Sequence, residues 1–228
     1  MMMPPRLTVI GDLERRDHYF LPNEARCYSW GEYTPYEHTN GLKWDFSPTN
    51  HLITNFKKKM DRQGRADWHY KRDAIETVAR AFSQFWRWDD LHAQNRVALI
   101  PIPPSKPRTD PMFDPRMAET LATVANLVGL PLDIRDCLSF SGTFSASHAS
   151  DVRPTPVDLY NDLAFDPSVG RPGEPPGVIF LFDDMLTTGA HYVAATQKLA
   201  VYFPSVPFVG NFIARRCVPD PFEDFERA

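Results

Sequence analysis

The feature that most constrains the fold is an uninterrupted apolar run of five residues, Val178 to Phe182 (VIFLF). A strand with this composition must be buried on both faces, which is typical of a central strand in a parallel sheet. Two acids follow directly, Asp183 and Asp184, and then a Thr-Thr-Gly turn. A helix is predicted over 188–202. The segment therefore predicts a buried strand that passes through a polar turn into a helix.

Apolar runs and helical periodicities on both sides of this segment indicate the fold class. Strands are predicted at 97–102, 132–138 and 206–213, and helices at 67–88 and 114–128. An alternation of strands and helices is typical of an α/β domain with a parallel sheet. We therefore expect an α/β fold in which helices flank a parallel sheet.

The chain is expected to divide into two parts. Residues 1–66 are predicted to form a small, irregular, aromatic-rich N-terminal cap or hood, with a short helix from Ser47 onward; an irregular extension packed on the core explains this segment equally well. Residues 67–228 are predicted to form the α/β core. Within the core, 139–156 are rich in Ser, Gly, Thr and Pro and are predicted to form a long mobile loop, which is either a functional lid or disordered. Residues 157–165 are predicted to be a helical turn.

The bulk composition limits the class of protein. The formal net charge is −4, which gives no support for nucleic acid as a partner. The three cysteines are far apart in the sequence, which argues against a disulfide framework and against a clustered zinc site. No apolar run approaches the roughly 18 residues of a membrane span. We therefore expect a cytoplasmic protein without a membrane anchor.

The turn after the apolar run carries the chemistry. Adjacent carboxylates at the end of a buried strand can accept hydrogen bonds from vicinal hydroxyls, such as those of ribose. Hydroxyls, a glycine and the free N–H groups of a helix N-terminus make an anion site, which Thr187, Thr188 and Gly189 would supply. A diol site just before a phosphate site matches a ribose 5-phosphate. The alternative is a plain strand–turn–helix junction with capping threonines. The spacing excludes a haloacid-dehalogenase motif, a Walker loop and a dinucleotide-binding glycine motif.

The sequence Asp-Asp-x-x-Thr-Thr-Gly after an apolar run resembles the central motif of type I phosphoribosyltransferases. The resemblance implies a type I phosphoribosyltransferase-like sheet that binds phosphoribosyl pyrophosphate (PRPP) together with Mg²⁺. It implies that Asp183 and Asp184 are the catalytic carboxylates and hold the ribose hydroxyls. The PRPP-binding motif would then continue through Met185, Leu186, Thr187, Thr188, Gly189, Ala190 and His191. The family usually has Thr or Ser where this chain has His191. We assign no residue as a direct protein ligand of a metal.

The order of segments resembles the ComF-type, competence-associated branch of that superfamily. Residues 97–104 are similar to its first strand and pyrophosphate loop, 161–165 to the block before its central strand, and 212–215 to its last strand. Two features of the branch are missing. One is the upstream four-cysteine zinc ribbon, and the other is an Arg-Gly-Phe-Asn block, where this chain reads MFDPRM at 112–117. The chain therefore has the pattern of a diverged relative.

The resemblance implies functional roles for two further segments. Pro104, Ser105 and Lys106 would form the pyrophosphate loop, although the prolines around them remove N–H donors and a stiffened surface turn explains them as well. His148 and Arg153 would belong to a flexible lid that closes over the substrate, or equally to a simple connector.

Two charged clusters receive no functional role from the sequence. The lysine run 57–59 is predicted to be a solvated helix face rather than a phosphate contact. The acid pair 89–90 follows a predicted helix rather than a strand, and we interpret it as a surface turn.

The resemblance implies a phosphoribosyltransferase that transfers ribose 5-phosphate from PRPP to a nitrogenous base and releases pyrophosphate. A second hypothesis is a non-catalytic regulatory module that binds PRPP or a nucleotide 5'-phosphate and is linked to DNA handling. A third is another nucleoside-5'-phosphate enzyme on the same fold. A homodimer is compatible with each of these hypotheses.

Overall fold

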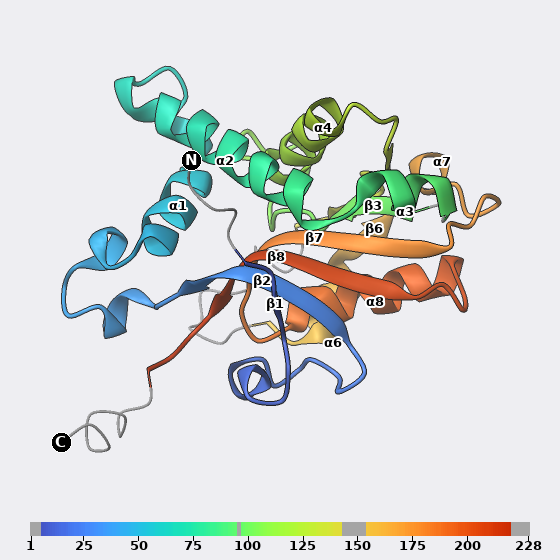
Figure 1. Ribbon diagram of the computed structural model, residues 1–228, viewed down its shortest axis with the longest axis horizontal. Helices are drawn as coiled ribbons and strands as arrows, with labels where there is room; N and C mark the ends of the chain where they lie inside the picture. Colours follow the sequence, from blue (N-terminus) through green and yellow to red (C-terminus); the bar gives the residue numbers. More distant parts are fainter. Residues whose placement is uncertain (1–5, 95–96, 143–153, 220–228) are drawn as a thin grey trace.

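The computed structural model describes residues 6–94, 97–142 and 154–219, and its main feature is a six-stranded sheet with the order β1-β2-β8-β7-β3-β4. Each neighbouring pair in this sheet is parallel except β1 and β2 (Figure 1). The predicted α/β fold is therefore confirmed, and the sheet, predicted to be parallel, is parallel except for the edge strand β1. The strands of the main sheet are β1 Thr8–Val9, β2 Arg26–Tyr33, β3 Val97–Pro101, β4 Asp133–Ile134, β7 Val178–Leu186 and β8 Phe208–Arg216.

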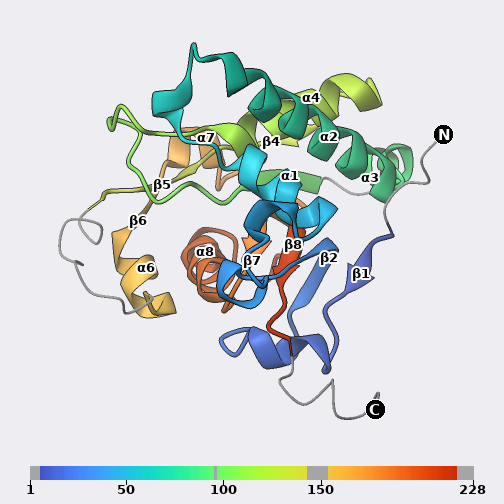
Figure 2. The same cartoon turned by 90° about the vertical axis from the view of Figure 1, so that its left-hand side faces the viewer.

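Helices cover both faces of the sheet. Figure 2 shows α1, α2 and α4 on one side, and α6 and α8 on the other. The α-helices are α1 Pro48–Phe56, α2 His69–Phe85, α3 Trp88–Gln94, α4 Arg116–Val128, α6 Pro156–Asp162, α7 Pro167–Gly170 and α8 Ala190–Tyr202. Short 3-10 helices are η1 Glu14–Asp17, η2 Tyr36–His38, η3 Lys43–Asp45, η4 Met60–Arg62 and η5 Ala66–Trp68.

The apolar run in β7 is the centre of the core. Ile179 and Leu181 belong to the apolar cluster on the α8 side, and Phe180 and Phe182 to the cluster on the α2 side. Phe182 packs edge-on against Phe82 of α2, with ring centroids 5.1 Å apart. Because side chains alternate between the faces of a strand, a run without polar residues is stable only when both faces are covered. The prediction of a central strand from this run is confirmed.

The central strand extends further than the apolar run. β7 continues through the two acids to Leu186, and Asp183, Met185 and Leu186 pair in register with β8. The strand can continue because β8 runs on to Arg216 and supplies backbone partners for the polar residues. The two acids therefore lie within a paired strand, whereas the sequence predicted that they follow its end.

The predicted strand 132–138 is divided in the structure. Only β4 pairs with the main sheet, and β5, Leu138–Phe140, forms a separate antiparallel pair with β6, Leu163–Phe165. The predicted helical turn 157–165 consists of α6 and β6. Thr155 explains where α6 starts, because it forms a capping box with Asp158. The acid pair 89–90, expected in a turn, lies in the first turn of α3.

The N-terminal segment is more regular than an irregular cap. β2 lies parallel to β8 over its whole length, from Arg26 opposite Val209 to Tyr33 opposite Arg216. Its first residues alternate, with Cys27 and Ser29 buried, which allows one face to pack on the α8 side of the core. The short helix expected from Ser47 is α1, and the Ser47 side chain accepts a hydrogen bond from the Asn50 N–H at 3.1 Å. The first 66 residues therefore both extend the sheet and add α1 to the face that α2 covers.

Candidate functional site

The connections of the sheet create a crevice between β3 and β7. The chain leaves β3 through α4 and returns at β4 on one side, and it leaves β7 through α8 and returns at β8 on the other side. In open α/β sheets, ligands bind at such a switch point, beyond the carboxyl ends of the strands. A cavity of about 510 Å³ lies there, lined by residues from the ends of both strands.

The cavity brings together two segments that the sequence had marked separately. From the central motif it is lined by Asp183, Asp184, Met185, Thr187 and His191. From the loop after β3 it is lined by the predicted pyrophosphate-loop residues Pro104, Ser105 and Lys106. Other motif residues are buried away from the cavity surface, namely Leu186, Thr188, Gly189 and Ala190. His148 and Arg153 lie outside the described residues.

The Thr-Thr-Gly turn is held from one side by the N-terminal segment. Phe20 donates its N–H to the Thr188 carbonyl at 3.0 Å, and His18 Nδ1 bonds to the Thr187 carbonyl. Gly189 has φ = +89°, and a Cβ atom there would lie 3.1 Å from the Leu21 nitrogen. The turn thus requires glycine for its conformation and for close packing. Gly189 provides no side-chain cap for α8, and among the described residues Thr188 Oγ1 accepts only the Ala190 N–H, at 3.4 Å, so the N–H groups that follow it can serve an anion.

The two adjacent acids have different environments. Asp184 is 6% exposed, and both carboxylate oxygens are paired: Oδ1 with Lys57 Nζ at 2.9 Å and Oδ2 with Arg116 Nη2 at 2.5 Å. Burial opposes ionisation of this carboxyl, but the two positive charges and their hydrogen bonds outweigh it and hold the pKa of Asp184 well below its usual range. Asp184 is therefore ionised at neutral pH, and its charge is already balanced.

Asp183 has a hydrogen bond but no ion pair with the described residues. Its Oδ1 accepts the Asp184 N–H at 2.7 Å, and its side chain lies at the cavity surface. Burial and the neighbouring negative charge of Asp184 raise the pKa of Asp183, because both disfavour a second charge. A cation or a hydroxyl donor that enters the cavity would relieve this cost. Asp183 is therefore the carboxylate that is poised to bind a ligand.

A chain of charges connects the site to the helix layer. Arg116, at the start of α4, donates to both Asp184 and Asp114. Asp114 also accepts from Lys71 Nζ at 2.7 Å, and Lys71 is only 2% exposed. Burying charged groups costs several kcal/mol unless they are paired and hydrogen-bonded, as they are here. The alternating signs therefore fix Arg116 at the cavity wall.

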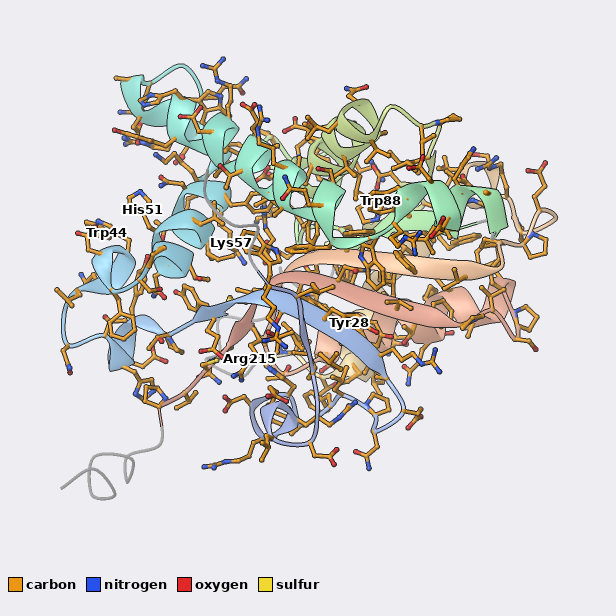
Figure 3. All side chains as sticks on the ribbon, in the orientation of Figure 1. Tyr28, Trp44, His51, Lys57, Trp88 and Arg215 are labelled. Atoms are coloured by element: carbon orange, nitrogen blue, oxygen red, sulfur yellow. The ribbon has the colours of Figure 1, made fainter. Side chains whose placement is uncertain are left out.

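Sequence reasoning did not assign three cationic groups of this cavity. Lys57 and Lys59 line it, although the run 57–59 was expected to be a solvated helix face, and Arg116 was given no role. Figure 3 shows Lys57 beside the end of α1, near the carboxyl end of the sheet. The only sequence signal for the lysines was the run itself. Lys57 and Asp184 are 127 positions apart in the sequence, so their contact depends on how α1 packs and has no local sequence signal.

The loop after β3 contributes charge but few backbone donors. Pro103, Pro104 and Pro107 have no N–H group. Lys106 lines the cavity and lies 3.6 Å from Asp110, whereas Arg108 forms an ion pair with Asp136. The anion-binding capacity of this wall therefore comes from side chains more than from main-chain amides.

His191 is the remaining polar group at the cavity. Burial lowers the pKa of His191, and the negative charge of Asp184 only partly offsets this effect. The ring packs edge-on against Phe140 at a centroid distance of 6.0 Å. A neutral imidazole donates one hydrogen bond and accepts another, so the N–H of His191 can take the place of a hydroxyl donor to a phosphate.

The acids of the site could take part in binding a metal ion together with a ligand. Among the described residues, no group of three or more His, Cys, Asp or Glu side chains is placed to hold a metal ion. Mg²⁺ is often bound through one or two carboxylates and the phosphates of a substrate, and Asp183 fits that use.

The described helices include none that is long and apolar enough to cross a membrane.

Comparison with known proteins gives no assignment. No protein-family model matches the chain, and no curated protein matches it significantly. Any functional conclusion must therefore come from the site itself.

Proposed function

We propose that this protein is a phosphoribosyltransferase of type I character, which binds PRPP with Mg²⁺ and transfers ribose 5-phosphate to a nitrogenous base. The observation that carries the proposal is the cavity at the β3–β7 switch point. Into it face a diacid, a threonine turn before a helix, and four cationic side chains, Lys57, Lys59, Lys106 and Arg116. PRPP, a ribose with a phosphate at one end and a diphosphate at the other, offers both the hydroxyls and the negative charge that these groups complement.

Each part of the cavity would contribute a physical effect. The helix N-terminus, with Thr187 and His191, would bind the 5'-phosphate. Asp183 would accept hydrogen bonds from the ribose hydroxyls and favour positive charge that develops on the sugar. Mg²⁺, when bound with PRPP, neutralises charge on the leaving diphosphate. The protein's part in the reaction is then positioning and electrostatics.

A pyrophosphate-release assay tests this proposal. The protein is mixed with PRPP and Mg²⁺, purine and pyrimidine bases are added one at a time, and released pyrophosphate is measured. We expect release with at least one base, and loss of release in the Asp183→Asn variant. Lys198→Met is a matched control, because Lys198 packs over Tyr160, away from the cavity. Equal release by Asp183→Asn and the parent would contradict the assignment.

The second candidate is a non-catalytic PRPP or nucleotide sensor. The pairing of both Asp184 oxygens with cations favours it, because those oxygens are less available to a ribose. Calorimetry distinguishes the two functions. Binding of PRPP in the micromolar range without pyrophosphate release under any base would support the sensor, and absence of PRPP binding would exclude both.

A further inference from the structure

The three lysines after α1 do not point the same way. Lys57 and Lys59 line the cavity, and Lys57 Nζ lies 2.9 Å from Asp184 Oδ1. Lys58, between them, donates to the Asp67 carbonyl oxygen at 2.8 Å and to its carboxylate at 3.2 Å. Lys57 and Lys59 therefore direct their charges toward the cavity, whereas Lys58 has a structural role. We call Lys57 and Lys59 the lysine arm.

A buried lysine fixes the backbone that carries the arm. Lys71 Nζ donates to the Phe56 carbonyl at 2.9 Å, to the Lys58 carbonyl at 3.0 Å and to Asp114 at 2.7 Å. These three bonds use all three hydrogens of the ammonium group. Two of the acceptors flank Lys57 in the chain, so the position of Lys57 is set from inside the protein. Through Asp114 the same ammonium is coupled to Arg116, which binds the other carboxylate oxygen of Asp184.

The loop after β3, which lines the same cavity, has few main-chain N–H donors. Three prolines in the loop after β3, Pro103, Pro104 and Pro107, remove N–H groups that could otherwise bind phosphoryl oxygens. An ammonium group has three donors, and Asp184 takes one of those on Lys57. Lys57 can therefore hold Asp184 and a phosphoryl oxygen at once, because its side chain is 40% exposed.

We propose that the lysine arm is the diphosphate-binding element of this site, so that Lys57 and Lys59 replace the main-chain donors that the proline-rich loop lacks. This inference rests on the proposed function for the identity of the ligand. The bridge from Lys57 to Asp184 sets the distance between the diphosphate and the sugar. Selectivity for a ligand with a diphosphate over one with a single phosphate then originates in the N-terminal segment.

Binding measurements with three probes test the arm. Calorimetry with Mg²⁺ is performed for PRPP, inorganic pyrophosphate and ribose 5-phosphate. For the double variant Lys57→Met with Lys59→Met, we expect affinity for PRPP and pyrophosphate to fall about tenfold or more. Affinity for ribose 5-phosphate should change less than about twofold, because the arm does not contact the 5'-phosphate. The matched control, Lys58→Met, removes a lysine from the same run and should retain all three affinities.

The outcomes separate the arm from the proposed function. If the parent protein binds PRPP and the double variant binds it equally well, the lysine arm does not bind the diphosphate, and the proposed function of the protein stands. If the parent binds pyrophosphate but not PRPP, and the double variant loses pyrophosphate, the proposed function fails and the arm stands as a diphosphate site. An equal loss of affinity for all three probes indicates a general defect of the variant and also refutes the diphosphate-binding role of the lysine arm. The charge-preserving pair Lys57→Arg with Lys59→Arg should keep most of the pyrophosphate affinity.

Discussion

Replacing each of the two adjacent acids by asparagine should have opposite effects on stability. Asp184→Asn removes the charge that Lys57 and Arg116 share, and its amide N–H₂ group would face one of these cations. Asp183→Asn removes a carboxylate whose pKa is raised by burial and by Asp184, while its amide oxygen can still accept the Asp184 N–H. The first change leaves positive charge unbalanced, and the second relieves repulsion.

The environments of the two acids set the size of each effect. Removing one partner of a buried ion pair costs about 3–5 kcal/mol. For Asp184→Asn we expect about 2 kcal/mol, because Arg116 keeps Asp114 as a partner and Lys57 can turn to solvent. One unit of pKa shift corresponds to about 1.4 kcal/mol. For Asp183→Asn we expect a gain of about 1 kcal/mol, since the cavity leaves this carboxylate partly solvated.

The two effects also differ in their pH dependence. A raised folded-state pKa means that the contribution of Asp183 to stability is intact below its unfolded value and is lost as pH rises through the folded value. The gain in Asp183→Asn should therefore be absent near pH 4 and grow as pH rises. The pKa of Asp184 is lowered, so its contribution is present above the unfolded value and disappears only in stronger acid.

Urea unfolding at pH 4, 6 and 8 measures both variants. With a slope of about 2–3 kcal/mol/M, the loss in Asp184→Asn should lower the midpoint by roughly 1 M at neutral pH. The midpoint of Asp183→Asn should lie above that of the parent at pH 8 and coincide with it near pH 4. A similar loss of stability in both variants, independent of pH, would refute the electrostatic distinction between the acids.

Three further predictions concern the surroundings of the site. Lys71→Met should lower the free energy of unfolding by about 3 kcal/mol, because two carbonyls and Asp114 lose a buried donor. It should also weaken pyrophosphate binding. Urea unfolding measures the first effect, and unchanged stability would contradict the reasoning. Gly189→Ala should cost about 1–2 kcal/mol in thermal unfolding, because φ is +89° there, and a change within error would count against the required glycine. Burial lowers the pKa of His18, so protonation opposes folding, and the parent should lose stability as pH falls below about 6.5. His18→Gln should show a smaller loss between pH 7 and 5 in a series of melting curves, and identical slopes would refute this.

The strand–turn–helix that frames the cavity could be predicted from local sequence. The run Val178 to Phe182 admits few structures, because an uninterrupted apolar strand must be covered on both faces. The loop after β3 could also be located, because the carboxyl ends of parallel strands meet at one edge of a sheet. The part played by β2 was not predicted, since its pairing with β8 depends on residues about 180 positions away and not on a local pattern.

The sequence by itself determined that a buried apolar strand leads through a threonine–glycine turn into a helix, because these features depend on neighbouring residues. It placed the two acids after the strand, whereas in the structure they belong to the strand that pairs with β8. Only the tertiary structure decided how the two acids differ. Asp183 and Asp184 are the same residue type at adjacent positions, so no local pattern separates them. Cations that follow α1 and begin α4 neutralise Asp184 and leave Asp183 at the cavity surface, because electrostatic energy depends on distance in space and not on separation along the chain.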